Sequence, residues 1–381
     1  FLLSALSPSE FGDTKPKRRG RTRRTIVTSK RKAKKREYAR LQALYKRNRS
    51  NCFNSLFEKA SLSPDLDDRD VFDFWSHLFT RSSPQNFKND SPFILSDKDI
   101  TEDLFVTPQE IYSARLPFSS SSGPDGASVK TLNKIPIRCR CKIYTAFLLL
   151  RWVPSFLLDS RTVFLPKKEN TSKPSMLRPL SISSTMLRQF HKVLAKRLMA
   201  VLDPALDVYQ FGFRQMDGIA EAVLLFGYMV QSACTNFSTI AVAVLDMEKA
   251  FDSVSHDAIF EALQKINISP VMKDYLKFTY THAKTFLCFN GSIKSEPVRP
   301  TRGVRQGDPM SPLLFLLVFD QVLNAIPDYE GFHFENKRIN HIAFADDLVL
   351  VADSMVGLNN IINRILPALT WSGLSISWRN R

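Results

Sequence analysis

The chain has 381 residues, of which 44% are hydrophobic, and this is enough for one large core of several lobes or for two ordinary domains. The longest apolar run, residues 312–319, is far shorter than the roughly 20 residues that cross a bilayer, so we expect no membrane partner. The net charge is +16, and residues 1–50 contribute +14 of it through 17 basic and 3 acidic side chains. This uneven charge indicates a polyanionic partner, although a disordered tail or a nuclear-localisation segment can have the same composition.

The basic arm, residues 1–50, is the first predicted element. Residues 33–49 place Tyr and Leu side chains on one face of a predicted helix and cations on the other face. We expect nucleic acid to bind the basic residues of this helix, Arg36, Arg40, Lys46 and Arg47. Further along the chain, the "SSSSGPDG" segment at residues 119–126 is predicted to be a loop.

The next informative segment is a β-branched run, residues 239–245, which predicts a buried strand with Asp246 at its end. A helix is predicted to follow at residues 253–265, and Asp252 is placed to cap it. Residues 311–312, Ser-Pro, are typical of a helix N-cap followed by Pro at the first helical position, and they predict an apolar helix that reaches toward Ile326.

Two short apolar runs, residues 342–345 and 348–352, are separated only by Asp346 and Asp347. This pattern predicts a tight hairpin with both carboxylates at its bend. The helix that begins near Val356 is expected to cover the resulting sheet from one side.

These carboxylates suggest a metal site. An Asp-Asp pair in a turn is usually only a turn, but two carboxylates at the bend of a buried hairpin repel each other, and a cation relieves that repulsion. If the strand that ends at Asp246 pairs with the hairpin, it brings Asp246, Asp346 and Asp347 together. Nucleotidyl transfer needs an arrangement of this kind, because two hard divalent cations about 3.5–4 Å apart require oxygen ligands.

Three segments resemble successive palm motifs of reverse transcriptases, and they occur in the expected order: "LDMEKAFDSV" at 245–254, "GVRQGDPMSPLLF" at 303–315 and "FADD" at 344–347. Three upstream segments resemble earlier motifs of that superfamily: "SGPDG" at 122–126, typical of non-LTR and intron-encoded enzymes, "FLPKKENTSKPSMLRPLSI" at 164–182 and "QFGFRQMDG" at 210–218. The resemblance covers residues 110–375. Residues 36–50 and 216–221 look like those of the site-specific elements that insert into ribosomal RNA genes.

The resemblance implies an α+β fold shaped as a right-hand polymerase, with an antiparallel palm sheet backed by helices and mixed fingers. It places a helical N-terminal extension at residues 51–110, mainly fingers at 111–238, and mainly palm at 239–381 with a fingers insertion around 260–300. The chain begins with Phe, and we expect it to be a piece of a longer protein, without the thumb and the endonuclease.

The metal-binding roles can be carried over to matching residues. The resemblance implies that Asp246 and Asp346 bind two Mg²⁺ ions, with Mn²⁺ as an alternative, that Asp347 supports them, and that the carbonyl of Met247 is a further ligand. Phe251 matches the aromatic residue that blocks a 2′-hydroxyl and so selects deoxynucleotides. The alternative for Phe251 is a core aromatic at the start of a helix.

Other matched residues would bind the nucleotide or the template. Gln306 and Gly307 match a turn that contacts the incoming nucleotide, and Lys167 and Arg178 match the cations that grip the triphosphate, unless they are solvated surface charges. Arg214 either contacts nucleic acid or braces the palm.

The expected activity is that of an RNA-directed DNA polymerase of a non-LTR retrotransposon, working by target-primed reverse transcription. Its partners would be template RNA, a DNA primer or target and deoxynucleoside triphosphates, in the nucleus of a eukaryotic host, and its oligomeric state is open. The alternative is a non-catalytic RNA-binding remnant of a truncated element. A viral type of RNA polymerase is disfavoured by Phe251 and by "FADD". The last segment, residues 373–381, resembles a further palm motif but has Ser377 where Asn is expected.

Overall fold

The computed structural model describes residues 66–81, 104–167, 171, 173–289, 292–293 and 296–377, all of which belong to one unit, Leu62–Arg381. The basic arm lies outside the described residues, and so do its predicted binding residues, Arg36, Arg40, Lys46 and Arg47. Their roles therefore stay predictions.

An antiparallel sheet carries the predicted carboxylates. Its strands have the order β3-β9-β8, with bounds β3 (Ala241–Leu245), β8 (His341–Phe344) and β9 (Asp347–Ala352). Alternate side chains of the central strand β9 pack on the two faces of the sheet. Leu348 and Leu350 join the main core, while Val351 joins a smaller cluster on the opposite face. The predicted hairpin is confirmed.

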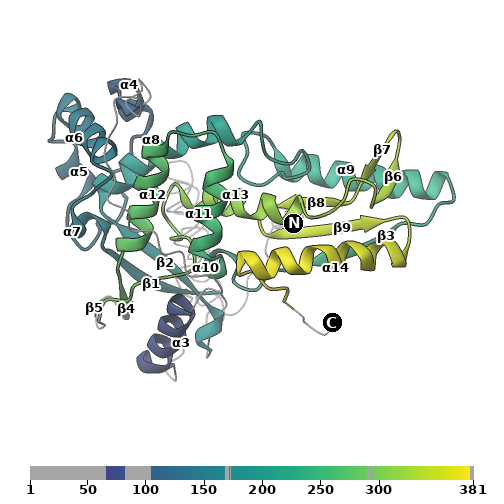
Figure 1. The fold of residues 1–381 in the computed structure, drawn as a ribbon. Helices are drawn as coiled ribbons and strands as arrows, with labels where there is room; N and C mark the ends of the chain where they lie inside the picture. The colour runs from purple at the N-terminus through teal and green to yellow at the C-terminus, as the bar shows by residue number, and fades with distance from the viewer. Residues whose placement is uncertain are drawn as a thin grey trace, which may run out of the picture. The chain divides into compact units, whose positions relative to one another are not determined.

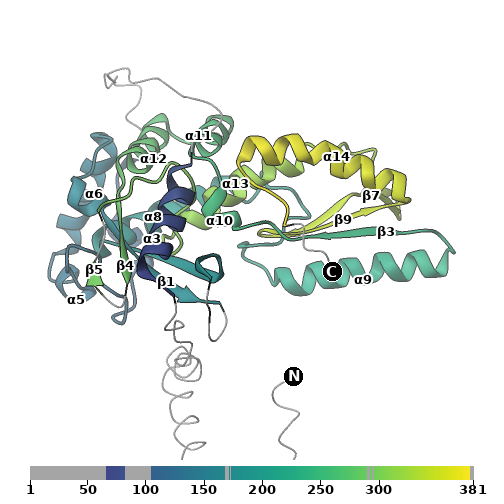
Figure 2. The same cartoon turned by 90° about the horizontal axis from the view of Figure 1, so that it is seen from below.

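Two long helices cover the two faces of this sheet (Figure 2), α14 (Met355–Ser372) on one side and α9 (Gly218–Thr235) on the other. The start of α14 agrees with the prediction, since the Ser354 side chain caps it by accepting from the amide of Gly357. Met229 and Ala233 of α9 are buried, but most of that helix is exposed. Of the helices in the described part of the chain, α9 alone is long and apolar enough for a membrane span, which is a weak indication by itself.

The strand β3 differs from its prediction. It was expected to be buried, but it lies at the edge of the sheet, and only Ala241 and Leu245 are buried. Val244 is 77% exposed. A β-branched run predicts an extended conformation whether or not both faces are covered, so the run could not distinguish an edge strand from a central one.

The apolar helix α13 (Ser311–Leu323) lies at the centre of the unit (Figure 1), where it packs against α8 (Thr185–Leu202), α11 (His256–Lys265) and α14. Its predicted cap was wrong by one position: Met310 is the N-cap, and Ser311 and Pro312 are the first two helical residues. The hydroxyl of Ser311 instead donates to the carbonyl of Arg305 at 2.7 Å, which ties the preceding turn to the helix. The helix ends three residues before Ile326.

The helix predicted at residues 253–265 is present as α11 but begins three residues later, and a break at residues 254–255 separates it from a short preceding helix, α10 (Ala250–Ser253). The break follows from backbone pairing, because the amide of Gly303 donates to the carbonyl of Val254 and the amide of Ser255 donates to the carbonyl of Ser372. These long-range bonds replace helical ones. The expected cap by Asp252 was also wrong, since its carboxylate accepts from the side chain of Gln306 and no side chain caps α11.

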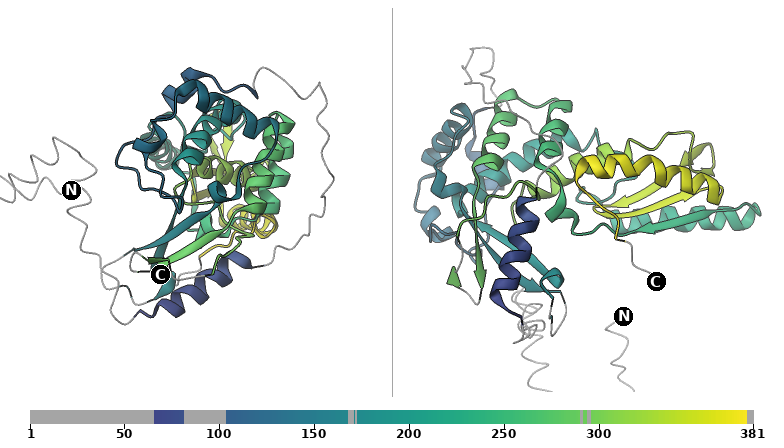
Figure 3. Two further views of the ribbon diagram at one scale, coloured as in Figure 1. Left: turned by 90° about the vertical axis from the view of Figure 1, so that its left-hand side faces the viewer. Right: turned by 60° about the horizontal axis from the view of Figure 1, so that its bottom comes forward.

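A second, mixed sheet has the order β2-β1-β4-β5, with bounds β1 (Ser160–Pro166), β2 (Leu177–Ser183), β4 (Thr285–Phe289) and β5 (Ser292–Ile293). The pairing of β1 with β2 is antiparallel, and that of β1 with β4 is parallel. The helix α3 (Asp68–Thr80), purple in Figure 3, lies along this sheet and inserts the fully buried Trp75 against Phe164. Segments more than 100 residues apart thus share one sheet.

The remaining described elements are α4 (Pro108–Ser113), α5 (Val129–Leu132), α6 (Ile137–Leu149), α7 (Ser155–Leu158), η3 (Pro174–Met176), α12 (Pro270–His282), β6 (Phe332–Phe334) and β7 (Lys337–Ile339). Residues 119–126 form a loop, as predicted. The architecture is mixed, with an antiparallel sheet, a mixed sheet and helices around a shared core, and it agrees with the expected α+β class.

Candidate active site

The turn between β8 and β9 is tighter than predicted. The pairing of Phe344 with Asp347 leaves only Ala345 and Asp346 in the loop, so Asp347 is the first residue of β9 and not part of the bend. Ala345 has φ +56°, as the two-residue turns of hairpins require at their first position. Glycine is usual there, because a left-handed conformation costs an L-residue roughly 1–2 kcal/mol.

Asp246 and Asp346 meet at one cleft. They lie in the lining of a cavity of about 970 Å³. Burial, together with the negative charges of Asp347 and Asp246, raises the pKa of Asp346, while Lys167 opposes the rise. The fold therefore brings two of the three predicted carboxylates to the same cavity, although they are 100 residues apart in the sequence.

Asp347 is placed differently. It is exposed and does not line the cleft. Within the described residues, no group of three or more His, Cys, Asp or Glu side chains is placed to hold a metal ion. Asp346 lies in the two-residue turn, whereas Asp347 is already the first residue of β9, where its side chain is exposed.

The backbone beside Asp246 supplies a further oxygen. The amide of Ser377 donates to the carbonyl of Asp246 at 2.7 Å, and the amide of Glu248 donates to the carbonyl of Ser375 at 2.9 Å. Because successive peptide groups of an extended chain point to opposite edges, the carbonyl of Met247 faces away from this C-terminal segment. Ser377, which stands where Asn was expected, contributes its backbone amide here.

The donors at this cleft suit a hard divalent cation. Asp246 and Asp346 offer carboxylate oxygens and Met247 a carbonyl oxygen, and no soft ligand is among them. Burial is the main cause of the raised pKa of Asp346, the negative charges of Asp347 and Asp246 add to it, and a bound cation would oppose both effects. The two carboxylates therefore fit a metal, whereas Asp347 lies outside the lining of the cleft.

Cationic side chains line the cleft from the second sheet. Lys167 follows β1 and Arg178 lies in β2, and both are exposed and face the same cavity as the carboxylates. The charge of Lys167 also opposes the rise in the pKa of Asp346. The predicted role of both cations in gripping a triphosphate stays a prediction.

Lys249 is a cleft residue that the sequence did not single out. It has φ +48°, its Nζ lies 4.3 Å from the ring centroid of Trp75 and 4.7 Å from that of Phe74, and it donates to the carbonyl of Ser175 at 3.0 Å. Burial lowers the pKa of Lys249 to about 8, which the charge of Asp252 partly opposes. Only the tertiary contact with α3 reveals this environment, since nothing in the motif itself marks Lys249 as unusual.

Gln306 and Gly307 line the cleft, but their groups are already engaged with protein. The Gln306 side chain donates to Oδ1 of Asp252 at 2.7 Å, and the backbone carbonyl of Gln306 accepts from the amide of Ser181 at 2.8 Å. Gly307 has φ +108°, and a Cβ there would lie 2.8 Å from the carbonyl oxygen of Ser181. Glycine is thus required for close approach to β2. Burial raises the pKa of Asp252 to about 7.

Phe251 combines features of both its predicted roles. Its ring stacks on that of Phe315 with centroids 4.6 Å apart and meets Phe213 edge-on at 5.9 Å. It is half-buried, and it also lines the cleft. One part of the ring therefore belongs to the core and another part faces the space where a nucleotide could bind.

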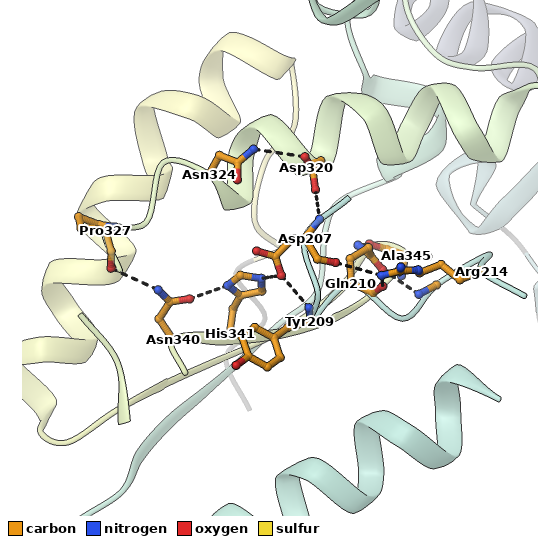
Figure 4. A network of polar contacts seen from close by, with 11 residues as sticks. Asp207, Tyr209, Gln210, Arg214, Asp320, Asn324, Pro327, Asn340, His341 and Ala345 are labelled. Atoms are coloured by element: carbon orange, nitrogen blue, oxygen red, sulfur yellow. Dashed lines mark hydrogen bonds and ion pairs between the residues drawn. The ribbon is translucent and has the colours of Figure 1, made fainter. Parts of the chain in front are cut away.

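Arg214 is held by protein groups (Figure 4). Its Nε donates to the carboxylate of Asp203 at 2.8 Å, and its terminal nitrogens donate to the carbonyls of Asp203, Asp207 and Gln210. It does not line the cleft. Of its two predicted roles, these contacts favour bracing over contact with nucleic acid.

Comparison with known proteins decides the family. A family model described as reverse transcriptase (RNA-dependent DNA polymerase) matches residues 165–379, which include all the cleft motifs. The chain belongs to the reverse transcriptase family. The resemblance inferred from the palm motifs is thereby confirmed, and divalent-metal-dependent catalysis is general in this family.

The relatives of this reverse transcriptase are retrotransposon proteins. It is 38% identical to the Pol polyprotein from type-1 retrotransposable element R2 of Nasonia vitripennis, over 71% of this chain and 26% of that protein. It is 31% identical to the Pol polyprotein from type-2 retrotransposable element R2DM of Drosophila melanogaster, over 96% of this chain and 33% of that protein. The corresponding protein of Bradysia coprophila is 33% identical over 99% of this chain and 43% of its own length. The chain thus spans less than half the length of these relatives.

Proposed function

We propose that this chain is the polymerase part of a non-LTR retrotransposon protein and that it copies template RNA into DNA, extending a DNA primer with deoxynucleoside triphosphates. The observation that carries the proposal is the convergence of Asp246 and Asp346 on one cleft lined by Lys167 and Arg178. Anionic ligands for cations and cationic ligands for phosphate lie together there, as the binding of a triphosphate requires.

The parts of a right-hand polymerase can be assigned on the same basis. The β3-β9-β8 sheet with α13 and α14 would be the palm, because the carboxylates lie at its end. The β2-β1-β4-β5 sheet would be the fingers, because Arg178 lies in its strand β2 and Lys167 directly follows its strand β1. The return of β4 and β5 to this sheet supports the expected fingers insertion around residues 260–300.

The metal would be held by Asp246, Asp346 and the carbonyl of Met247, with Asp347 in a supporting role from outside the lining of the cleft. When bound, two divalent cations, expected to be Mg²⁺ with Mn²⁺ as an alternative, would neutralise the triphosphate and lower the pKa of the primer 3′-hydroxyl. Lys167 and Arg178 would orient the triphosphate by charge-assisted hydrogen bonds.

Target-primed reverse transcription is the mode that we propose for the longer protein. The R2 names of the relatives support the site-specific subgroup, in which nicked genomic DNA supplies the primer and element RNA supplies the template. A nuclear location follows from that use of genomic DNA.

Primer extension on poly(rA)/oligo(dT) with Mg²⁺ tests the proposal. Asp346→Asn should reduce extension roughly 1000-fold or more, because a lost metal ligand removes several kcal/mol of transition-state stabilisation. Asp347→Asn should be less severe, since Asp347 is exposed outside the cleft. The matched control is Asp353→Asn, which removes a carboxylate just beyond β9, where Asp353 pairs with Arg338 at 2.6 Å.

The outcomes separate the proposal from its alternatives. RNA binding without any extension by the unmodified chain would support the non-catalytic remnant. Equal use of ribonucleotides would support an RNA polymerase. Substantial extension by Asp346→Asn would show that this carboxylate does not hold a catalytic metal.

A further inference from the structure

The segment around Gln210 lies along the free edge of the catalytic hairpin. The amide of Phe211 donates to the carbonyl of Ala343 at 2.8 Å, and the amide of Ala343 donates to the carbonyl of Tyr209 at 2.9 Å. The segment therefore pairs in parallel with β8 and follows it toward the turn. This pairing brings the side chain of Gln210 to the loop that carries Asp346.

The Gln210 side chain holds the residue that precedes Asp346 (Figure 4). Its Oε1 accepts from the amide of Ala345 at 3.0 Å and from the amide of Gly212 at 2.8 Å, and its Nε2 donates to the carbonyl of Ala345 at 3.4 Å. Gln210 is 1% exposed, so these bonds form where water does not compete. Both backbone polar groups of Ala345 are thus bound by one amide.

Ala345 needs such support because its φ of +56° is unfavourable for a residue with a Cβ. A strained backbone conformation persists only where the surroundings determine it. A second contact acts on the same residue, since a Cβ at Gly212 would lie 2.2 Å from the amide nitrogen of Ala345. Two independent features of the segment therefore fix the backbone at Ala345.

The segment is itself anchored on its other side (Figure 4). The carboxylate of Asp207 accepts from the amide of Tyr209 at 2.7 Å, and Nε2 of His341 lies 3.1 Å from the same oxygen. The amide of Asp207 donates to Asp320 of α13 at 2.8 Å, and Arg214 donates to the carbonyl of Gln210. These contacts join Gln210 to β8 and to the central helix, so the amide is presented from a rigid base.

We propose that Gln210 is a positioning residue, which keeps Ala345 in the left-handed conformation and so directs the carboxylate of Asp346 into the cleft that Asp246 also lines. The affinity for the divalent cation depends on this placement, because the two carboxylates must reach the same ion. The inference rests on the proposed metal-binding role of Asp346.

The test uses the full chain and measures Mn²⁺ binding directly by calorimetry without nucleic acid, beside the Mg²⁺ concentration for half-maximal primer extension. Gln210→Ala should weaken Mn²⁺ binding and raise the half-activating Mg²⁺ concentration about tenfold, the equivalent of about 1.4 kcal/mol. The maximal rate at saturating Mg²⁺ should fall much less, since Gln210 does not line the cleft.

Gln189→Ala is the matched control for a general loss of stability. Gln189 is also 1% exposed, and its Oε1 accepts from Arg140 at 2.9 Å and from Tyr144 at 3.0 Å, away from the cleft. This variant should melt at a lower temperature and keep the metal dependence of the unmodified chain. If Gln210→Ala behaves in the same way as Gln189→Ala, the positioning role is wrong.

A second variant tests the route through the backbone. Glycine adopts positive φ without strain, so Ala345→Gly combined with Gln210→Ala should restore Mn²⁺ binding to within about threefold of the unmodified chain. A double variant as weak as Gln210→Ala would exclude action through Ala345. Asp346→Asn separates the proposed metal site from the positioning role of Gln210. If this variant binds Mn²⁺ as well as the unmodified chain does, the proposed metal site is wrong, whatever the result for Gln210.

Discussion

The replacement of Phe251 by Ala gives the sharpest test of how the cleft selects its substrate. The ring is packed on one side against Phe315, with centroids 4.6 Å apart, and it lines the cleft elsewhere. If the sugar of an incoming nucleotide lies against this ring, a 2′-hydroxyl has no room. Forcing an extra group against a well-packed side chain costs about 3 kcal/mol, and this corresponds to a preference of roughly 100-fold for deoxynucleotides.

The same replacement also has a structural cost. A fully buried Phe→Ala change costs about 3–5 kcal/mol, and the half-buried ring of Phe251 should contribute about half of that, near 2 kcal/mol. The melting temperature should therefore fall by several degrees whether or not the ring acts as a gate. Stability alone cannot decide between the two roles.

The deciding measurement is kcat/KM for matched ribo- and deoxynucleotides, taken together with the melting temperature. Phe251→Ala should reduce the preference for deoxynucleotides by about 100-fold, mainly by increasing ribonucleotide use. The control is Phe315→Leu, which disturbs the same stack at a residue that is 0% exposed and does not line the cleft. It should lower both kcat/KM values alike.

The result that would refute the reasoning is a lowered melting temperature with an unchanged ratio of the two kcat/KM values. Phe251 would then be a core residue whose loss depresses both substrates equally. Phe251→Tyr adds a further check, because it retains the ring and should retain the discrimination.

The other predictions concern pH, a turn and the basic arm. Burial raises the pKa of Asp252 to about 7, so the folded chain keeps the carboxyl proton at pH values where the unfolded chain has lost it. The stability that this proton contributes is therefore lost as the pH rises from about 4 through 7. We expect the free energy of unfolding of Asp252→Asn, measured in urea and taken relative to that of the unmodified chain, to be higher at pH 8 than at pH 5. The same difference between the two chains at both pH values would contradict this. Gly307→Ala should lower the melting temperature by strain of about 1–3 kcal/mol, since φ is +108° and its Cβ would meet Ser181, whereas an unchanged melting temperature would mean that the turn can shift. Deletion of residues 1–35 should flatten the dependence of log K on log salt for RNA binding, by about 0.7–0.9 for each lost phosphate contact, and an unchanged slope would indicate a localisation signal or a passive tail.

The sequence by itself determined the elements that carry the site. Two short apolar runs on either side of Asp346 and Asp347 predict the hairpin, and the helix that covers it was expected to begin near Val356, one residue from its observed start at Met355. These features depend on local patterns, because the side-chain period of a strand and the cap of a helix are properties of a few adjacent residues. The palm motifs added the family, and with it Asp246 and Asp346 as partners.

Other features were decided only by tertiary structure. Asp347 was expected at the bend of the hairpin together with Asp346. The loop has only two residues, so Asp347 is instead the first residue of β9 and lies at the surface. Lys249 owes its lowered pKa to packing beneath Trp75, and the side chain of Gln306 is bound to Asp252. None of these environments follows from the residue type or from its neighbours in the chain.

The link between Gln210 and Ala345 shows the physical reason most clearly. The two residues are separated by 135 positions in the chain, yet one buried amide binds both backbone groups of the other residue. Local propensity argues against a left-handed Ala, because its Cβ clashes with the backbone. That conformation is accessible only because long-range pairing of β8 with the Gln210 segment supplies the hydrogen bonds that hold it, and such pairing exists only in the folded chain.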